Sequence, residues 1–311
     1  MKKRILSITP NPALDLSGRA QEIIPNEKTY VFDERRDPGG NALNAARIIH
    51  RLGSAVTVSG FLGGSTGEEV KNLILEEGLK AHFIKIKSPT RVNVTVWNMK
   101  DHRQTRLSFP GPRVSRKEKE DLLQYFRKSH GIQMLLLGGS LPSGFSQNEL
   151  VGLMREAKKR GIATIVDSPA DILKTLIKEK PLLVKPNLEE FHQLTGSRIH
   201  SLKSVVKKAS TYLGTVRFFC VSSVEGGTVL VTREGSYFGK IPKVKIRSTV
   251  GAGDSMVGAM AAAIFNGEES PEEVLRWGLA ASAATLSHQG THLGSASLIR
   301  SLRKKTQVTR L

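Results

Sequence analysis

The 311-residue sequence has one cysteine, few aromatic residues and no long apolar run. Its lone cysteine, Cys220, cannot form a disulfide within the chain, and its apolar neighbours predict a buried strand residue in a reducing cytoplasm. An aromatic content of 5% leaves few side chains for stacking on bases. No segment approaches the ~20 apolar residues of a membrane span, and the first apolar run is too short for a signal peptide. We therefore expect a cytoplasmic protein without a membrane anchor.

Acidic residues are also scarce, since 28 Asp and Glu face 47 Lys and Arg, which leaves a net charge of +19. Such an excess favours anionic partners. The basic residues are spread along the chain, with only short clusters such as 158–160 and 303–305. A solvated basic surface or a phosphorylated small molecule accounts for this pattern better than a nucleic-acid site, so we expect no nucleic-acid partner.

Strand-like and helix-like segments alternate along the chain. Continuous apolar runs at 134–137, 162–166, 182–184 and 218–221 are typical of strands covered on both faces. Helical stretches begin where a Ser or Thr is followed three residues later by Glu, as in a capping box; these pairs are Thr66 with Glu69, Ser115 with Glu118, and Ser146 with Glu149. The alternation predicts an α/β fold whose mainly parallel sheet has helices on both sides.

Two stretches, 15–37 and 88–109, interrupt this alternation with polar, strand-like sequence. In the second, apolar Val92, Val94 and Val96 alternate with polar residues, as expected for a half-exposed strand. We predict that both stretches form a small antiparallel flap. No linker rich in Pro, Gly or Ser divides the chain, so residues 1–311 are expected to form one domain with a strand-built lid.

The strongest local signal is the segment Gly251-Ala252-Gly253-Asp254, which precedes an apolar stretch of high helix propensity. Small residues let backbone amides approach a phosphate, and a helix N-terminus attracts anions. Asp254 would there accept a proton from an attacking hydroxyl, although a simple helix cap is the structural alternative. The segment lacks the third glycine of a dinucleotide fingerprint and the Gly-Lys-Ser/Thr of a Walker A loop, so both of those interpretations fail.

Two further segments carry polar groups next to helix starts. Gly39 and Gly40 precede a helix that contains Asn44, and their amides suit sugar hydroxyls, although an ordinary turn would look the same. The segment 185–190 ends an apolar strand with an amide and two carboxylates, which suits hydrated Mg²⁺ near phosphates. A capped surface helix is the alternative there.

Together these segments resemble the ribokinase-like PfkB superfamily, in its branch of 1-phosphofructokinases, tagatose-6-phosphate kinases and minor 6-phosphofructokinases. The resemblance covers nearly the whole chain and rests on seven motifs in family order: Asn11-Pro12-Ala13-Leu14-Asp15, Gly39-Gly40, Thr90-Arg91-Val92-Asn93, Phe109-Pro110-Gly111-Pro112, Gly139-Ser140-Leu141-Pro142, Lys185-Pro186-Asn187 and Gly251-Ala252-Gly253-Asp254.

The resemblance implies a three-layer α/β/α sandwich with a β lid, a sugar phosphate and ATP with Mg²⁺ as ligands, and a homodimer formed through the lid. It leaves a monovalent-cation requirement open. It implies that Asp254 is the catalytic base, assisted by Gly251, Ala252 and Gly253. The other matched positions are Asp15, Gly39, Gly40, Asn44 and Asn93 for the sugar; Lys28, Arg91, Arg106 and Ser140 for its phosphate; Lys185, Asn187, Ser222, Gly227 and Ser287 for the nucleotide; and Asn187 with Glu190 for Mg²⁺, through water.

The sequence departs from the branch in one motif. Many members have Gly-Gly-Lys-Gly where this chain has Gly39-Gly40-Asn41-Ala42, so one cation is missing, and Arg35 or Arg36 would have to replace it. Three alternatives stay open: a kinase of an unphosphorylated sugar or nucleoside, an idle sugar-phosphate sensor, and a nucleic-acid-binding protein on the same fold.

Overall fold

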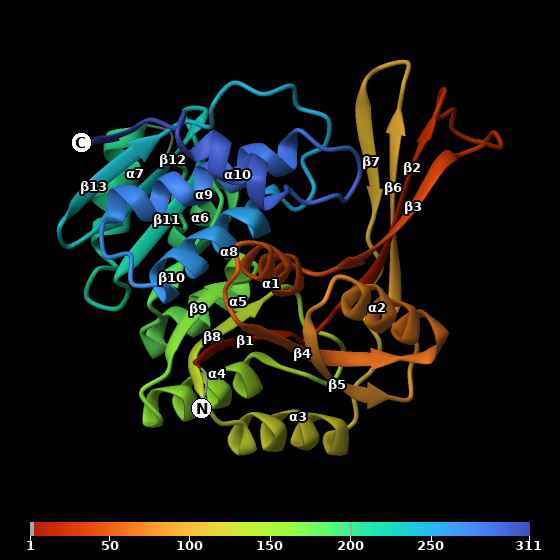
Figure 1. The fold of residues 1–311 in the computed structure, drawn as a ribbon, viewed down its shortest axis with the longest axis horizontal. Helices are drawn as coiled ribbons and strands as arrows, with labels where there is room; N and C mark the ends of the chain where they lie inside the picture. Colours follow the sequence, from red (N-terminus) through yellow and green to blue (C-terminus); the bar gives the residue numbers. More distant parts are fainter. Residues whose placement is uncertain (1–2, 200) are drawn as a thin grey trace.

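The structure is a computed structural model that describes residues 3–199 and 201–311, and it is built on one large twisted sheet (Figure 1). Its strand order is β14-β13-β12-β11-β10-β9-β8-β1-β4-β5, parallel from β11 to β5 and antiparallel from β11 to β14. The prediction of a mainly parallel sheet is confirmed. The strands are β1 (Arg4–Thr9), β4 (Val56–Gly63), β5 (Lys80–Ile86), β8 (Ile132–Gly138), β9 (Ala163–Asp167), β10 (Leu183–Val184), β11 (Phe218–Val224), β12 (Gly227–Thr232), β13 (Gly235–Gly239) and β14 (Val308–Arg310).

Helices cover both faces of this sheet, because its buried strands are apolar on both sides. Neighbouring β1 residues Ile5 and Leu6 point into two separate cores. One core contains side chains of α3 (Arg116–Lys128), α4 (Gln147–Lys159), α5 (Ala170–Leu176), α6 (Leu188–Thr195) and α7 (Leu202–Ser210), with the short 3₁₀ helix η1 (Ile177–Glu179). The other contains side chains of α1 (Asn41–Arg51), α2 (Gly64–Glu76), α8 (Ala252–Phe265) and α9 (Pro271–Leu286), and α10 (Ala296–Arg303) packs outside α9. The three-layer sandwich is therefore confirmed.

A second, four-stranded sheet projects from the body, and we call it the lid sheet (Figure 1). Its order is β3-β2-β6-β7, with bounds β2 (Ala13–Ala20), β3 (Phe32–Gly39), β6 (Arg91–Asn98) and β7 (Arg103–Leu107). The strands of the lid sheet thus come from residues 13–39 and 91–107. The prediction of a purely antiparallel flap is wrong, because two antiparallel hairpins are joined by parallel pairing of β2 with β6.

The predicted helix starts are correct in two of three cases. Ser115 and Ser146 both cap helices with complete capping boxes, to Glu118 and Glu149. The third prediction is wrong, because α2 already begins at Gly64, after Gly63. The Thr66 hydroxyl instead donates to the Thr90 carbonyl at 2.8 Å. Among the described residues, no helix combines the length and apolar character needed to cross a membrane.

Candidate functional site

The candidate site lies where the carboxyl ends of the parallel strands meet the start of helix α8. β9 ends at Asp167, β10 is followed directly by Lys185, and α8 begins at Ala252. Ligands of open α/β sheets bind at this edge, where loops carry polar side chains. Asp167 was not singled out from the sequence, although a carboxylate directly after an apolar strand is a usable signal.

The turn into α8 is built from glycine for steric reasons. Gly251 has φ of 74°, a left-handed conformation that favours glycine, and a Cβ there would lie 2.7 Å from Leu293. The first amides of α8 have no partner within the helix and carry its partial positive charge. The start of α8 is therefore suited to binding an anion, and Asp254 lies in the first turn of this helix.

The Asp254 carboxylate accepts a hydrogen bond of 2.9 Å from the Asn44 amide of α1. Although the residue keeps some solvent exposure, enclosure by protein and the negative charge of Asp167 raise its pKa to about 7. A carboxyl group with a pKa near neutrality is suited to accepting a proton at physiological pH. Helix capping alone does not explain it, because the N-cap position belongs to Gly251.

Arg47 holds Asn44 in place and was not identified from the sequence. Its guanidinium donates to the Asn44 Oδ1 at 3.2 Å, which leaves the Asn44 amide nitrogen facing Asp254. Arg47 is 2% exposed and binds the Glu77 carboxylate at 2.9 Å, and it also donates to the Pro38 carbonyl. Through Asn44, the arginine thus connects Asp254 to the end of lid strand β3.

Lys185 places a buried cation beside the same helix start. Its ammonium lies 3.6 Å from Asp167 Oδ1, and a Cβ on Gly253 would lie 3.2 Å from it. Burial lowers the pKa of Lys185, but the negative charges of Asp167 and Glu190 outweigh that effect and raise it above its usual value. The second Asp167 oxygen is buried without a partner in the described structure, so it is free to accept from a ligand.

Asn187 and Glu190 form a reciprocal capping box at the start of α6, with hydrogen bonds of 2.9 and 2.8 Å. Burial raises the pKa of the Glu190 carboxyl. The residues that the structure describes contain no group of three or more His, Cys, Asp or Glu side chains able to hold a metal ion. A magnesium ion would thus need phosphate oxygens and water for most of its coordination.

The residues predicted to bind sugar gather at the base of the lid sheet. Asp15 accepts a 2.8 Å hydrogen bond from Asn93 on the neighbouring strand. A Cβ on Gly39 would lie 2.2 Å from the Asp15 carboxylate, so only glycine fits there. Gly40 has φ of 128° and immediately precedes α1, the helix that carries Asn44. The structure therefore brings these five residues together with Asp254 through α1.

Of the four residues predicted to bind the substrate phosphate, three lie near this group. Burial raises the pKa of the Asp15 carboxyl, and the positive charges of Arg106 and Arg91 partly offset this increase. Arg91 also donates to the Phe109 and Asn11 carbonyls, and the Asn11 amide donates to Ser140 at 3.0 Å. These bonds tie the 109–112 and 139–142 motifs to the start of the lid strands.

Lys28 lies apart from them. It belongs to the loop between β2 and β3, at the opposite end of the hairpin from Gly39, and its ammonium stacks over Tyr30 at 4.6 Å. Ala20 lies five positions after Asp15 on an extended strand, which corresponds to roughly 17 Å. The structure therefore does not bring Lys28 to Asp15 within one chain. Arg36 also points elsewhere, since it pairs with Glu69 and Glu34.

Three of the residues predicted to bind the nucleotide make contacts within the protein itself. The Ser222 amide donates to the Pro186 carbonyl, which sets it beside Asn187. Gly227 packs against Phe238, and the Ser287 hydroxyl donates to the Ala284 carbonyl of its own helix. Cys220 is fully buried in β11, as predicted, and burial raises the pKa of its thiol to about 12.

The donor set fits a nucleoside triphosphate with Mg²⁺. Open amides at the start of α8, the buried Lys185 ammonium and the unpartnered Asp167 oxygen face one region. Next to that region lie the Asp254 carboxyl, whose pKa is raised, and the hydrogen-bonded side chains of Asp15 and Asn93 on the lid sheet. The fold and this arrangement define a small-molecule kinase.

Comparisons with known proteins agree. Residues 11–297 match the model of the pfkB family carbohydrate kinases, and the chain belongs to this family. It is 34% identical to the ATP-dependent 6-phosphofructokinase isozyme 2 of Escherichia coli (94% of this chain, 95% of the relative). It is 29% identical to a 1-phosphofructokinase of Bacillus subtilis (99% and 100%) and 30% identical to a tagatose-6-phosphate kinase of Staphylococcus epidermidis (88% of each).

The fold matches that of phosphofructokinase-2 from E. coli in complex with substrates and products, with a TM-score of 0.93 at 32% identity over 97% of this chain and 99% of that one. Other structures of that protein hold potassium (TM-score 0.90, 32% identity) or show a tetrameric inhibited form (TM-score 0.89, 31% identity), and each covers at least 97% of both chains.

Proposed function

We propose that this protein transfers the terminal phosphoryl group of ATP to the free hydroxyl of a ketohexose monophosphate, with Asp254 as the base. The observation that carries this proposal is the Asp254 carboxyl of raised pKa in the first turn of α8, next to Lys185 and across from Asp15. The relatives named for fructose 6-phosphate, fructose 1-phosphate and tagatose 6-phosphate chemistry support the substrate class.

In the proposed mechanism, Asp15 and Asn93 orient the sugar, and Asn44 holds the Asp254 oxygen toward the attacking hydroxyl. Asp254 accepts the hydroxyl proton as the new O–P bond forms. Arg106, Arg91 and Ser140 bind the phosphate that the sugar already carries, since guanidinium groups grip phosphate oxygens bidentately.

The proposed nucleotide contacts are the amides of Ala252 and Gly253 and the Lys185 ammonium, which stabilise negative charge on the transferring group. When bound, Mg²⁺ supplies further neutralisation of phosphate charge, and Asn187 and Glu190 would reach it through water. We propose Ser222, Gly227 and Ser287 as further nucleotide contacts, as the family resemblance implies. A monovalent cation is a further candidate, tested by replacing K⁺ with Na⁺ in the assay.

The test is ADP release from MgATP with fructose 6-phosphate, fructose 1-phosphate, tagatose 6-phosphate, unphosphorylated fructose and ribose, compared by kcat/KM. We expect a clear preference for one phosphorylated ketose. A preference for a free sugar would refute the role of Arg91 and Arg106, whereas no turnover with any of them would favour the sensor alternative.

We further propose that residues 1–311 act as one kinase domain in the cytoplasm and form a homodimer through the lid sheet. Large apolar side chains are exposed on the lid, including Tyr30 (74%), Leu107 (54%) and Phe109 (52%). Exposed apolar patches of this kind mark interaction surfaces. Leu107→Glu is expected to reduce self-association in sedimentation velocity, and an unchanged mass would exclude this surface.

A further inference from the structure

A cavity of about 620 Å³ lies at the amino ends of strands β9, β10 and β11, on the edge of the large sheet opposite the candidate site. Its lining includes Ala163 at the start of β9, Leu182 directly before β10 and Arg217 directly before β11. The volume is within the range of small-molecule sites. None of the residues predicted to bind sugar, nucleotide or metal, all of which the structure describes, lines this cavity.

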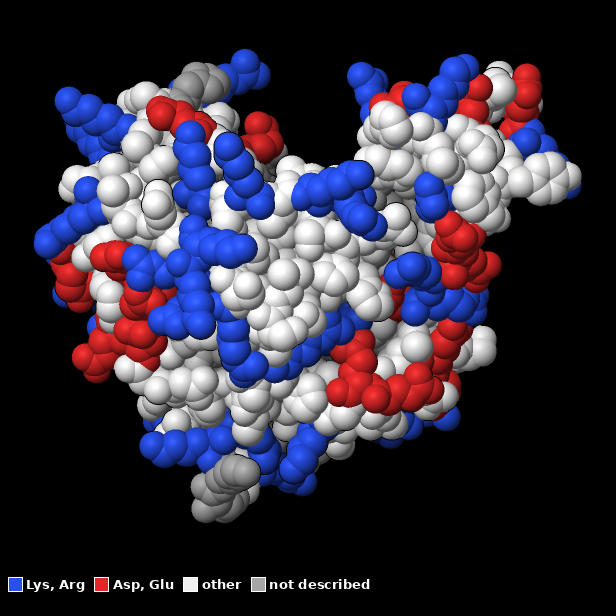
Figure 2. Space-filling model, turned by 45° about the horizontal axis from the view of Figure 1, so that its top comes forward, with Lys and Arg blue, Asp and Glu red and all other residues white. Residues whose placement is uncertain are grey.

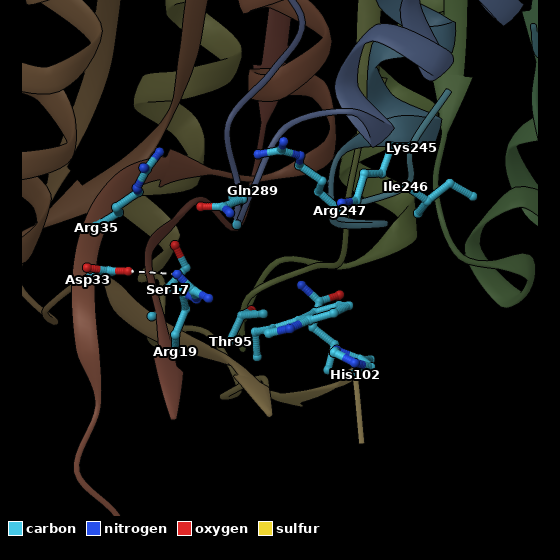
Figure 3. Close-up of a pocket in the computed structure, with 14 residues that line it drawn as sticks. Ser17, Arg19, Asp33, Arg35, Thr95, His102, Lys245, Ile246, Arg247 and Gln289 are labelled. Atoms are coloured by element: carbon cyan, nitrogen blue, oxygen red, sulfur yellow. Dashed lines mark hydrogen bonds and ion pairs between the residues drawn. The ribbon is translucent and has the colours of Figure 1, made fainter. Parts of the chain in front are cut away.

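The cavity and the candidate site lie at the two ends of the same strands. β9 starts at Ala163 beside the cavity and ends at Asp167 beside Lys185. The four steps between Ala163 and Asp167 on an extended strand correspond to roughly 13 Å. The smaller cavity between the lid sheet and residues 245–247 adjoins the sugar region instead, since it is lined by Ser17, two positions after Asp15 (Figure 3). The cavity at the amino ends is therefore separate from both.

Basic side chains outnumber carboxylates in the lining of this cavity. The basic residues are Lys158, Lys180, Arg217 and Arg233. None of the four forms an ion pair with any residue within 3–199 or 201–311, and the two carboxylates of the lining belong to Glu179 and Glu234. Glu179 is already paired with Arg155, outside the lining, at 2.9 Å. The remaining excess of positive charge attracts anions.

Exposed cations alone do not mark a binding site on this protein, because Lys and Arg side chains are spread over its surface (Figure 2). Lys158 also has another role, since it lies in the last turn of α4, where a cation stabilises the helix end. Arg217 and Arg233 lie outside all helices, so the same explanation does not apply to them. Their arrangement around the cavity therefore decides whether it can hold an anion.

Arg217 and Arg233 come together at one wall of the cavity. Hydrogen bonds from its own backbone and from Thr232 lower the pKa of Glu234, and the positive charges of Arg217 and Arg233 lower it further. Both guanidinium groups therefore lie close to this one carboxylate. The Arg233 Nε donates to the Leu213 carbonyl at 3.1 Å, which holds that guanidinium group at the cavity. Two guanidinium groups so placed can grip the oxygens of a larger anion bidentately.

The cavity also offers apolar contacts beside its cations. Leu182 and Leu213 line it and are only half-buried. An inorganic anion would leave both side chains against water, whereas the carbon skeleton of an organic anion would cover them and gain from their burial. A phosphoryl group carries about −1.5 to −2 charges at pH 7, which suits two arginines better than a single carboxylate does. The lining thus fits an organic phosphate.

We propose that the cavity at the amino ends of β9, β10 and β11 binds a phosphorylated organic metabolite. Arg217 and Arg233 bind its phosphoryl group in place of Glu234. Lys158 and Lys180 attract its remaining negative charge, and its carbon skeleton packs on the two leucines. Nucleotides and sugar phosphates share this chemistry, and the test distinguishes them.

The test places a fluorine label beside the cavity through Gly214→Cys. Gly214 lines the cavity and is exposed, and a Cβ there would have no contact within 4 Å among the described residues outside its chain neighbours. Because Cys220 is the only cysteine and is fully buried, a trifluoromethyl thiol reagent labels the introduced thiol alone. The labelled protein is titrated separately with ADP and fructose 1,6-bisphosphate, and sodium sulfate at matched ionic strength controls for screening.

We expect a saturable change in the fluorine chemical shift. Its midpoint should rise by about tenfold or more in the double variant Arg217→Gln/Arg233→Gln, because charge-assisted bonds to phosphate are strong. The control Arg127→Gln/Arg300→Gln removes two exposed arginines, from α3 and α10, that do not line the cavity, and should bind as the parent does.

Tighter binding of ADP supports the site and assigns its apolar wall to a nucleotide, and tighter binding of the bisphosphate supports it and assigns the wall to a sugar phosphate. No saturable change with either compound, an equal change with sulfate, or equal midpoints in the double variant and its control overturns the proposal. ADP bound at the candidate site would give equal midpoints, because Arg217 and Arg233 lie at the opposite edge of the sheet. Since the readout needs no turnover, the kinase assignment fails or stands separately.

Discussion

Asp254→Asn should make the protein more stable while removing its activity. The substitution keeps an oxygen that can accept from Asn44 but removes a carboxyl whose pKa rises from 3.8 to about 7 on folding. A group whose pKa is raised in the folded state gives stability that is fully present below pH 3.8 and is lost as the pH rises to about 7. Above that pH, the wild type bears the cost of a buried negative charge, and the variant does not.

The size of this cost follows from the shift, since one pKa unit corresponds to about 1.4 kcal/mol. At pH 8 the variant is expected to exceed the wild type in unfolding free energy by up to about 4 kcal/mol, and the difference should widen by about 2–3 kcal/mol between pH 5 and pH 8. Turnover should fall at least about 100-fold, which is typical when a general base is removed.

Urea denaturation at pH 5, 6, 7 and 8, followed by circular dichroism, measures the difference, and ADP release measures turnover. Asp171→Asn is a matched control, because Asp171 is also a carboxylate in a first helical turn but is exposed. Its effect should stay below about 1 kcal/mol at every pH. A stability difference for Asp254→Asn that does not change with pH would refute the raised pKa, and turnover within a few-fold of wild type would refute the role as base.

Three other substitutions test the surroundings of this carboxyl. Arg47→Met should cost about 3 kcal/mol of unfolding free energy in urea titrations, because it removes a buried ion-pair partner from both Glu77 and Asp37; a loss below 1 kcal/mol would contradict the network. Lys185→Met removes a charge that lowers the pKa of Asp254, so the acidic limb of the kcat profile should move to higher pH, and an unmoved limb would argue against their coupling. Gly39→Ala pushes on Asp15 and should lower kcat/KM by about 100-fold at a stability cost of about 1–3 kcal/mol, whereas full activity would remove Asp15 from the sugar site.

Local signals made the central part of the site predictable from sequence. The turn at Gly251 and the Asp254 carboxylate lie within four residues, so one short motif drew attention to both, and the role of Asp254 as base stays a prediction. The capping boxes at Ser115 and Ser146 could be predicted because each joins residues only three positions apart. Thr66 shows the limit, because Gly64 starts the helix two residues earlier and frees Thr66 to bond Thr90.

Tertiary contacts made the rest unpredictable. The parallel pairing of β2 with β6 joins segments some 78 residues apart in sequence, as in the bond between Asp15 and Asn93, and alternation within each segment cannot reveal it. Asp167 matters because β9 and β10 are neighbours, which places it beside Lys185. Lys28 matched a family position, but a sequence match does not show how far a residue lies from Asp15 along the β2–β3 hairpin.

Arg47 links the lid sheet to Asp254 although the two make no direct contact. It donates to Asn44, which holds Asp254, and also to the Pro38 carbonyl at the end of lid strand β3. Asp37, on the same strand, faces Arg47 at 3.6 Å and accepts from Thr291 in the loop after α9. Because a buried arginine cannot leave these partners without a large desolvation cost, the body end of the lid is fixed to the base, and any lid motion must be taken up further along the strands.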